Sequence, residues 1–100
     1  MRLSELQGDI LTTLTAFESL GHNEKVPAKV ILSLINTNRE SRGKAKIFGA
    51  ALRLSLKTMH SNQLVRKFKN KENGELSFLL TEDGRAIGID CMIKKEQQDI

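Results

Sequence analysis

The stretch from Asn62 to Arg85, NQLVRKFKNKENGELSFLLTEDGR, decides the fold class. Two short apolar runs, Leu64–Phe68 and Leu76–Leu80, flank a polar loop. That loop contains the dipeptide Asn73-Gly74, which favours the backbone conformation of a hairpin turn. The stretch therefore predicts a β-hairpin, and its lysines make that hairpin basic.

Two segments upstream of the hairpin have the periodicity of helices. The first starts with the spacing of a capping box at Ser4 and Gln7 and stops at Gly21, a residue that commonly ends helices. The second starts near Pro27, which suits a first helical turn because it has no N–H to leave unpaired. We expect the turn-rich residues 36–43 to end it. The apolar residues that recur every three or four positions in the first segment are Leu6, Ile10, Leu14 and Phe17.

The third segment, from Lys44 to His60, is predicted to be one long helix. On a helical wheel its basic residues fall within about 40° of a common axis, next to the small Gly49 and Ala50. These basic residues are Lys46, Arg53, Lys57 and His60. The opposite arc is apolar and is expected to be buried: Ile47, Phe48, Ala51, Leu52, Leu54, Leu56 and Met59. The cationic stripe is either a solvated face of a core helix or a contact surface for a polyanion.

The last segment has two interpretations. Thr81 can cap a helix over Glu82–Lys95, with Glu82 and Asp83 favourably placed at its positive end. Alternatively, Asp83-Gly84 is a turn and residues 86–93 form a strand. The helix is the favoured interpretation.

Positive charge is concentrated in one part of the chain. Residues 36–71 contain ten lysines and arginines and a single acid, Glu40, for a net charge of +9, whereas the rest of the chain carries −5. A strongly positive region on an otherwise acidic protein indicates a surface for a polyanion. Nucleic acid is the most common such partner, because clustered cations release counterions from its phosphates.

Composition limits the other classes of function. One hundred residues fit a single domain, residues 1–100, and the lone Cys91 cannot form an intramolecular disulfide. No apolar run approaches the roughly 20 residues that a membrane span needs, so we expect a cytoplasmic protein.

Neither a paired metal-ligand motif nor a phosphate-binding loop occurs, so neither an enzyme nor a cofactor is expected. The absence of Trp and Tyr argues against a base-stacking platform for single strands.

The order of helix, helix, long helix, basic hairpin and final helix resembles a winged helix-turn-helix domain. In residues 62–68, NQLVRKF resembles the turn from a recognition helix into the first wing strand. In residues 79–85, LLTEDGR resembles the LTE-x-GR stretch that follows the wing in MarR- and PadR-like transcription regulators. The resemblance implies a mostly helical α+β fold, with a three-helix core, a hairpin wing and a C-terminal helix. It also implies double-stranded DNA binding as a homodimer without a cofactor, and control of transcription, with repression the favoured outcome.

Carried over by position, the helix from Lys44 to His60 would be the recognition helix, and Lys67–Asn73 would be the wing. Arg53 and Lys46 could reach guanine edges, and Asn38 or Gln63 could meet adenine. The predicted DNA-binding residues are Asn38, Arg39, Arg42, Lys44, Lys46, Arg53, Lys57, Lys67, Lys69 and Lys71.

Two other functions fit the same basic surface. One is a protein-interaction module of a replication or anti-repressor assembly, in which the basic surface meets an acidic protein. The other is binding of duplex RNA.

Overall fold

The computed structural model describes residues 2–98, with side chains through Lys94. Within this range the elements run in the order α1 (Glu5–Ser19), β1 (Val26–Pro27), α2 (Ala28–Ser41), α3 (Gly49–Ser61), β2 (Val65–Lys69), β3 (Leu76–Leu80) and α4 (Glu82–Gln98). Helices and an antiparallel sheet confirm the predicted α+β class. The helical interpretation of the last segment is also confirmed.

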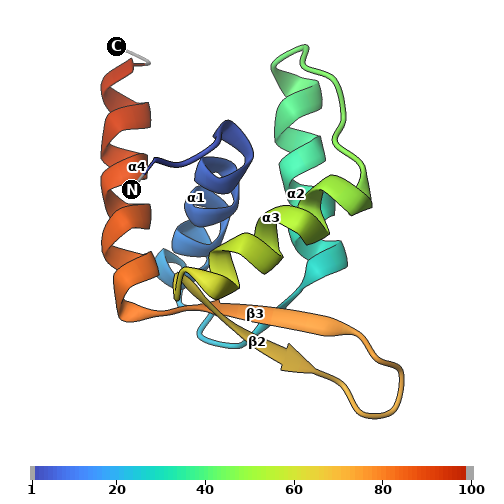
Figure 1. Cartoon of the computed structure of the whole chain (residues 1–100). Coiled ribbons are helices and arrows are strands. Elements are labelled where there is room, and N and C mark those ends of the chain that lie inside the picture. The colour runs from blue at the N-terminus through green and yellow to red at the C-terminus, as the bar shows by residue number, and fades with distance from the viewer. Residues whose placement is uncertain (1, 99–100) are drawn as a thin grey trace.

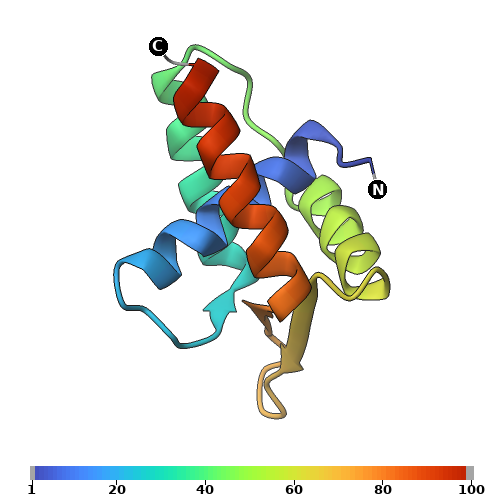
Figure 2. The same ribbon diagram turned by 90° about the vertical axis from the view of Figure 1, so that its left-hand side faces the viewer.

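Helix α1 lies in the middle of the molecule (Figure 1). Helix α4 packs along one side of α1, and α2 packs along another. Helix α3 crosses in front of α1 and α2 in Figure 1 and contacts β2, and the hairpin of β2 and β3 projects away from the helices (Figure 2). This arrangement leaves α3 and the hairpin together at one end of the molecule.

The core is a single cluster of buried side chains to which, among the described residues, every element except α4 contributes. Its members are at most 8 % exposed: Ile10, Leu11, Leu14, Val26, Ile31, Ile35, Leu52, Leu56, Met59, Leu64, Val65, Phe78 and Leu80. Burial of this much apolar surface is the main force that holds α3 and the hairpin in place.

The hairpin prediction is confirmed, but the sheet has a third strand that the sequence did not indicate. Strand β3 lies between β2 and β1, with Phe78 opposite Lys67 on one side and Val26 on the other. Pro27 belongs to this short edge strand and precedes α2 as its N-cap, rather than lying in the first turn of the helix. An edge strand tolerates proline because the missing N–H is not needed for pairing.

Both predicted ends of the first helix are confirmed. The Ser4 N–H donates to the Gln7 side-chain oxygen, and the Gln7 N–H donates to the Ser4 hydroxyl oxygen, each at 3.1 Å. At the other end, Gly21 has a φ of +89°. There the N–H groups of Gly21 and His22 donate to the carbonyls of Glu18 and Phe17, a Schellman arrangement.

The stretch after the hairpin, LTEDGR, attaches α4 to the rest of the molecule. The Thr81 hydroxyl donates to the Gln63 carbonyl at 2.6 Å and accepts from the Gly84 N–H at 2.9 Å. Arg85 donates two hydrogen bonds to the Glu18 carboxylate, at 2.7 and 2.9 Å. These hydrogen bonds and the negative charge of Glu18 raise the pKa of Arg85. Thr81 and Arg85 of this motif thus hold α4 against its neighbours.

Two glycines allow α4 to approach its neighbours closely. An added Cβ at Gly84 would overlap the backbone carbonyl of Leu64, and one at Gly88 would overlap the hydroxyl oxygen of Thr15. Any larger residue at these positions would push α4 away from α1 and from the end of α3.

The predicted boundaries of the second and third helices were wrong. Helix α2 continues through the turn-like residues 36–41, and α3 begins at Gly49 rather than Lys44. The reason is tertiary: the Asn36 amide donates to the Ile47 carbonyl at 3.1 Å and accepts from the Ile47 N–H at 2.8 Å. These two hydrogen bonds hold residue 47 in the non-helical connection that runs from 42 to 48.

The predicted buried arc of the third helix was also too broad. Only Leu52, Leu56 and Met59 are buried in α3. In contrast, Leu54 is 68 % exposed and Phe48, just before the helix, is 81 % exposed. Helix α3 therefore presents a wide face to solvent, and part of that face is apolar.

Candidate nucleic-acid interface

A groove runs between α3 and the wing, which we define as β2, β3 and the loop 70–75 between them. Its floor is apolar, and its rim carries Arg53, Lys57 and His60 from α3 and Lys67 from β2. No acidic side chain lines it. We call it the basic groove; its lining residues are Ala28, Arg53, Leu56, Lys57, His60, Ser61, Lys67, Leu76 and Phe78.

Strand register explains why Lys67 points to this groove and why Lys69 shares its face. Lys67 pairs with Phe78 and Lys69 pairs with Leu76, in the same alternation as the buried Val65 opposite Leu80. Because successive side chains of a strand point to opposite faces, Lys67 and Lys69 share the face that packs toward α3. Lys71 extends this row into the exposed loop.

Lysine and arginine side chains of the basic groove are not neutralised by carboxylates. In the described part of the chain, no salt bridge involves Arg53, Lys57, Lys67, Lys69 or Lys71. Helix α3 itself contains no acid that could pair with its cations. The groove is therefore a cationic surface available to a negatively charged partner.

Arg39, one of the predicted DNA-binding residues, has several partners within the fold. It is 20 % exposed, and its Nε donates to the Ala45 carbonyl at 2.6 Å. Its guanidinium also lies 3.7 Å from the Asp9 carboxylate and 3.9 Å from that of Glu5. Arg39 thus fastens the connection between α2 and α3 to the first turns of α1.

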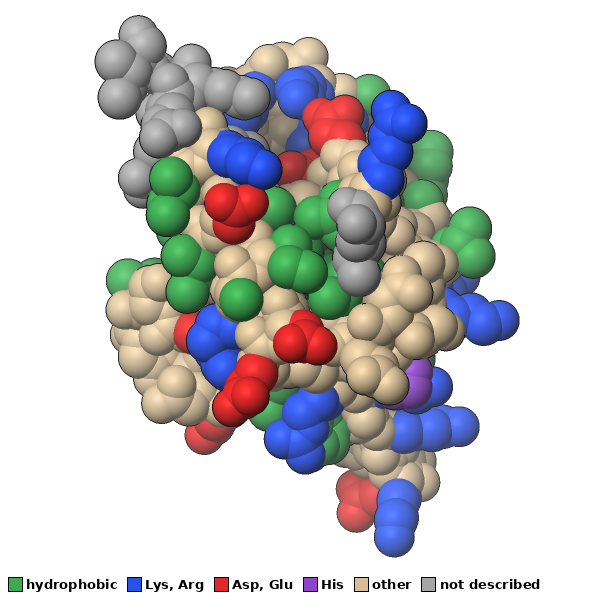
Figure 3. Space-filling model, turned by 60° about the vertical axis from the view of Figure 1, so that its left-hand side comes forward, with side chains coloured by type: hydrophobic (Ala, Val, Ile, Leu, Met, Phe, Trp, Pro, Cys, Tyr) green, Lys and Arg blue, Asp and Glu red, His purple; other side chains and the backbone are tan. Residues whose placement is uncertain are grey.

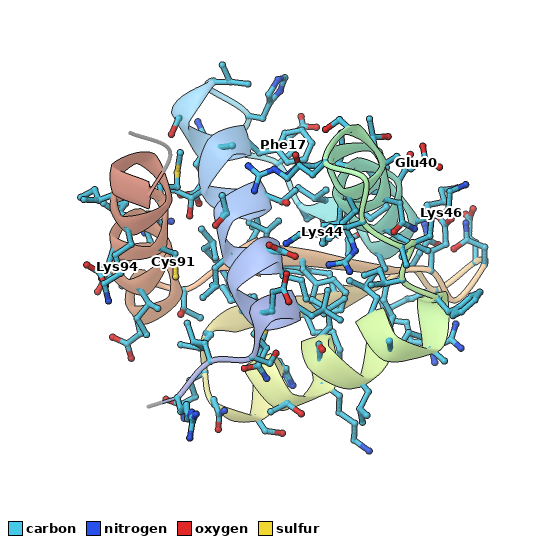
Figure 4. The ribbon with its side chains drawn as sticks, turned by 90° about the horizontal axis from the view of Figure 1, so that it is seen from above. Phe17, Glu40, Lys44, Lys46, Cys91 and Lys94 are labelled. Carbon is cyan, nitrogen blue, oxygen red and sulfur yellow. The ribbon has the colours of Figure 1, made fainter. Side chains whose placement is uncertain are left out.

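Lys44 and Lys46 lie in the same connection and also have carboxylate partners. The Lys44 ammonium lies 2.9 Å from Glu5, and that of Lys46 lies 3.0 Å from Glu40. Figure 4, seen from above, shows Glu40 and Lys46 near each other on the side away from α1 and Lys44 nearer α1. Since both lysines precede Gly49, neither belongs to the stripe on α3 in which Lys46 was predicted to lie.

Asn38 and Arg42 complete the predicted set. Both are exposed, Asn38 in the last turns of α2 and Arg42 at its C-cap. The predicted residues thus divide between two places. Arg53, Lys57, Lys67, Lys69 and Lys71 belong to α3 and the wing, while Asn38, Arg39, Arg42, Lys44 and Lys46 belong to the end of α2 and the connection.

Two polar residues of the groove were not in the predicted DNA-binding set. His60 and Ser61 line its inner end, one turn beyond Lys57. Their spacing from Arg53 and Lys57 was a usable signal, because residues three and four apart share a helix face.

The fold defined by these elements is a winged helix, in which α3 takes the place of the recognition helix and β2–β3 the place of the wing. It resembles AF1382 from Archaeoglobus fulgidus, with a TM-score of 0.74 and 19 % identity over 98 % of this chain and 92 % of that one. It also resembles the adhesin competence repressor AdcR from Streptococcus pyogenes, with a TM-score of 0.71, 16 % identity and 97 % of this chain covered.

A third similar structure is ZitR from Lactococcus lactis, a zinc-responsive MarR family member, with a TM-score of 0.71 and 19 % identity over 97 % of this chain. ZitR has also been solved in complex with DNA, and that structure matches with a TM-score of 0.69 and 17 % identity. The chain spans 59 % of AdcR and 56 % of ZitR. These likenesses confirm the predicted winged-helix fold of MarR type. The sequence itself matches no protein-family model and no curated protein.

Other classes of site are not evident among residues 2–98. No group of three His, Cys, Asp or Glu side chains there could hold a metal ion. Cys91 is partly buried against the core with other apolar side chains. None of the helices that the structure describes has both the length and the apolar character needed to cross a bilayer.

Proposed function

We propose that this protein is a sequence-specific double-stranded DNA-binding regulator that represses transcription by occupying its site. The main support for the proposal is the basic groove. There, cations of α3 and of the wing that have no carboxylate partner lie beside the solvent-exposed face of α3. A helix fits the major groove of duplex DNA, whose base edges differ for every pair. The winged-helix fold, shared with a protein solved in complex with DNA, supports the same conclusion.

In the proposed complex, α3 enters the major groove and the wing follows the adjacent backbone. Lys67, Lys69 and Lys71 contact phosphates, which supply affinity and register but no sequence information. Arg53 and Lys57 lie between the helix face and the wing, and contact phosphates or guanine edges at the border of the major groove.

A salt series tests the proposal directly. With five unpaired cations per protomer, about five phosphates are neutralised, so log K should fall with log salt at a slope of about −4.5. The measurement is fluorescence anisotropy on duplexes selected from a random pool. Binding that is insensitive to salt, or equally strong to every sequence in the pool, would contradict the proposal.

We further propose that the protein binds DNA as a homodimer that associates through α4. Ile89 and Ile93 lie one turn apart on this helix and are 46 % and 48 % exposed. Figure 3 shows apolar side chains gathered on the face that α4 occupies, whereas basic side chains follow the edge nearer α3 and the wing. Exposed apolar patches commonly mark association surfaces.

Sedimentation at micromolar concentration tests the dimer. The wild type should sediment as a dimer, and the variant Ile89→Lys with Ile93→Lys should sediment as a monomer. The matched control is Leu20→Lys, since Leu20 is 76 % exposed at the end of α1, outside α4. A monomeric wild type would contradict this part of the proposal.

A further inference from the structure

The exposed face of α3 has an unusual chemical character for a surface that reads bases. The residues of α3, GAALRLSLKTMHS, include no Asn, Gln, Asp or Glu. Amide side chains are the usual partners of adenine, and carboxylates accept from cytosine. Neither kind of contact is therefore possible from this helix.

The middle of this face is apolar. Ala50 and Leu54 lie four residues apart on one helix face, and both are exposed. Leu54, at 68 % exposure, is the largest apolar side chain there. The neighbouring Thr58 donates its hydroxyl back to the Leu54 carbonyl at 3.1 Å, so that hydroxyl is already engaged as a donor.

The cations of α3 lie to one side of the apolar strip that Ala50 and Leu54 form. Arg53 and Lys57 rim the basic groove on the wing side, and Leu54 does not line that groove. A duplex held by the groove and the wing would therefore bring its major-groove floor against Leu54 and Ala50. The only apolar group that a base pair presents in the major groove is the C5-methyl group of thymine.

We propose that Leu54 is a specificity-determining residue that recognises thymine through its methyl group. The inference rests on the proposed function, because it requires duplex DNA on α3. Arg53 and Lys57 then hold the duplex in register while Leu54 selects thymine at one or two positions of the site.

Replacement of thymine by deoxyuridine tests the proposal, because it removes only the methyl group and keeps the pairing. Each thymine of a selected duplex is replaced in turn, and affinity is measured for the wild type and for Leu54→Ala. Loss of one buried methyl contact should weaken wild-type binding about fourfold at the contacted position. Leu54→Ala should bind the thymine and deoxyuridine duplexes equally well.

Leu20→Ala is the matched control, since it shortens an exposed leucine just after α1, 76 % exposed against 68 % for Leu54, and should retain the fourfold preference of the wild type. Circular dichroism checks that Leu54→Ala keeps its helices, as expected for alanine on an exposed helix face. Salt-dependent binding without a deoxyuridine effect, or with an unchanged effect in Leu54→Ala, would overturn the role of Leu54 and leave the proposed function standing. Failure to bind any duplex would overturn both.

Discussion

The connection between α2 and α3 and the groove between α3 and the wing are equally rich in basic residues, but their cations have different surroundings. At the end of α2 and in the connection, Arg39, Lys44 and Lys46 lie within 4 Å of the carboxylates of α1 or α2. In the groove, Arg53, Lys57 and Lys67 have no such partners among the described residues. The density of positive charge along a sequence therefore does not show which cations have carboxylate partners, because that depends on the fold.

The strongest test of this difference is to reverse charge in the groove and, separately, in the connection. Arg53→Glu with Lys57→Glu should weaken duplex binding a hundredfold or more, because each lost charge-assisted contact is worth about 1.5 kcal/mol or more. Lys44→Glu with Lys46→Glu makes the same change in net charge but should have a much smaller effect. Anisotropy at one fixed salt concentration compares the two variants. Equal losses would show that the connection also contacts DNA.

The connection should matter for stability instead. Asn36→Ala removes both hydrogen bonds to the Ile47 backbone and should lower the free energy of unfolding by about 2 kcal/mol. Asn38→Ala, two residues along and exposed, should change it by less than about 0.5 kcal/mol. Urea denaturation followed by circular dichroism measures both. If the two variants were equally stable, the Asn36 contacts would not determine where α3 begins.

A single wing lysine should have a moderate effect on binding. Lys67→Ala should make the salt slope less steep by about 1 and weaken binding to all sequences alike, as expected for a phosphate contact. The readout is a salt titration on the selected duplex and on a scrambled one. A loss confined to the selected duplex would instead assign Lys67 to base recognition.

The smallest expected effect is that of Lys44→Ala. Its ion pair with Glu5 is largely exposed, with side-chain exposures of 48 % and 64 %, so its loss should change stability by less than about 1 kcal/mol. The salt slope of DNA binding should stay that of the wild type. A less steep slope would place Lys44 on the DNA.

Much of the fold could be predicted from local sequence. The capping box at Ser4, the stop at Gly21 and the hairpin signal at Asn73-Gly74 are encoded by neighbouring residues, and each is confirmed. The two helix boundaries around residues 36–48 were missed because they depend on one side chain, Asn36, that reaches a backbone group 11 positions away.

The candidate site was predicted only in part for a similar reason. Helical spacing and the hairpin placed Arg53, Lys57 and the wing lysines in adjacent elements. The carboxylates that pair with Arg39 and Lys44 come from α1, far away in sequence, and no pattern in the sequence connects them. The exposure of Leu54 was also missed, because an apolar residue on an amphipathic helix is usually assigned to the core.

The two hydrogen bonds between Asn36 and Ile47 have a practical consequence for protein engineering. Because these hydrogen bonds help to position the start of α3, the length of the segment before it does not by itself determine where the helix lies. Lengthening a surface loop adds only about 0.6 kcal/mol of closure entropy for each doubling. The bend around Gly43, exposed and with a φ of +70°, is therefore a suitable point for inserting a fluorophore-binding tag that reports on the protein while it is bound to its target.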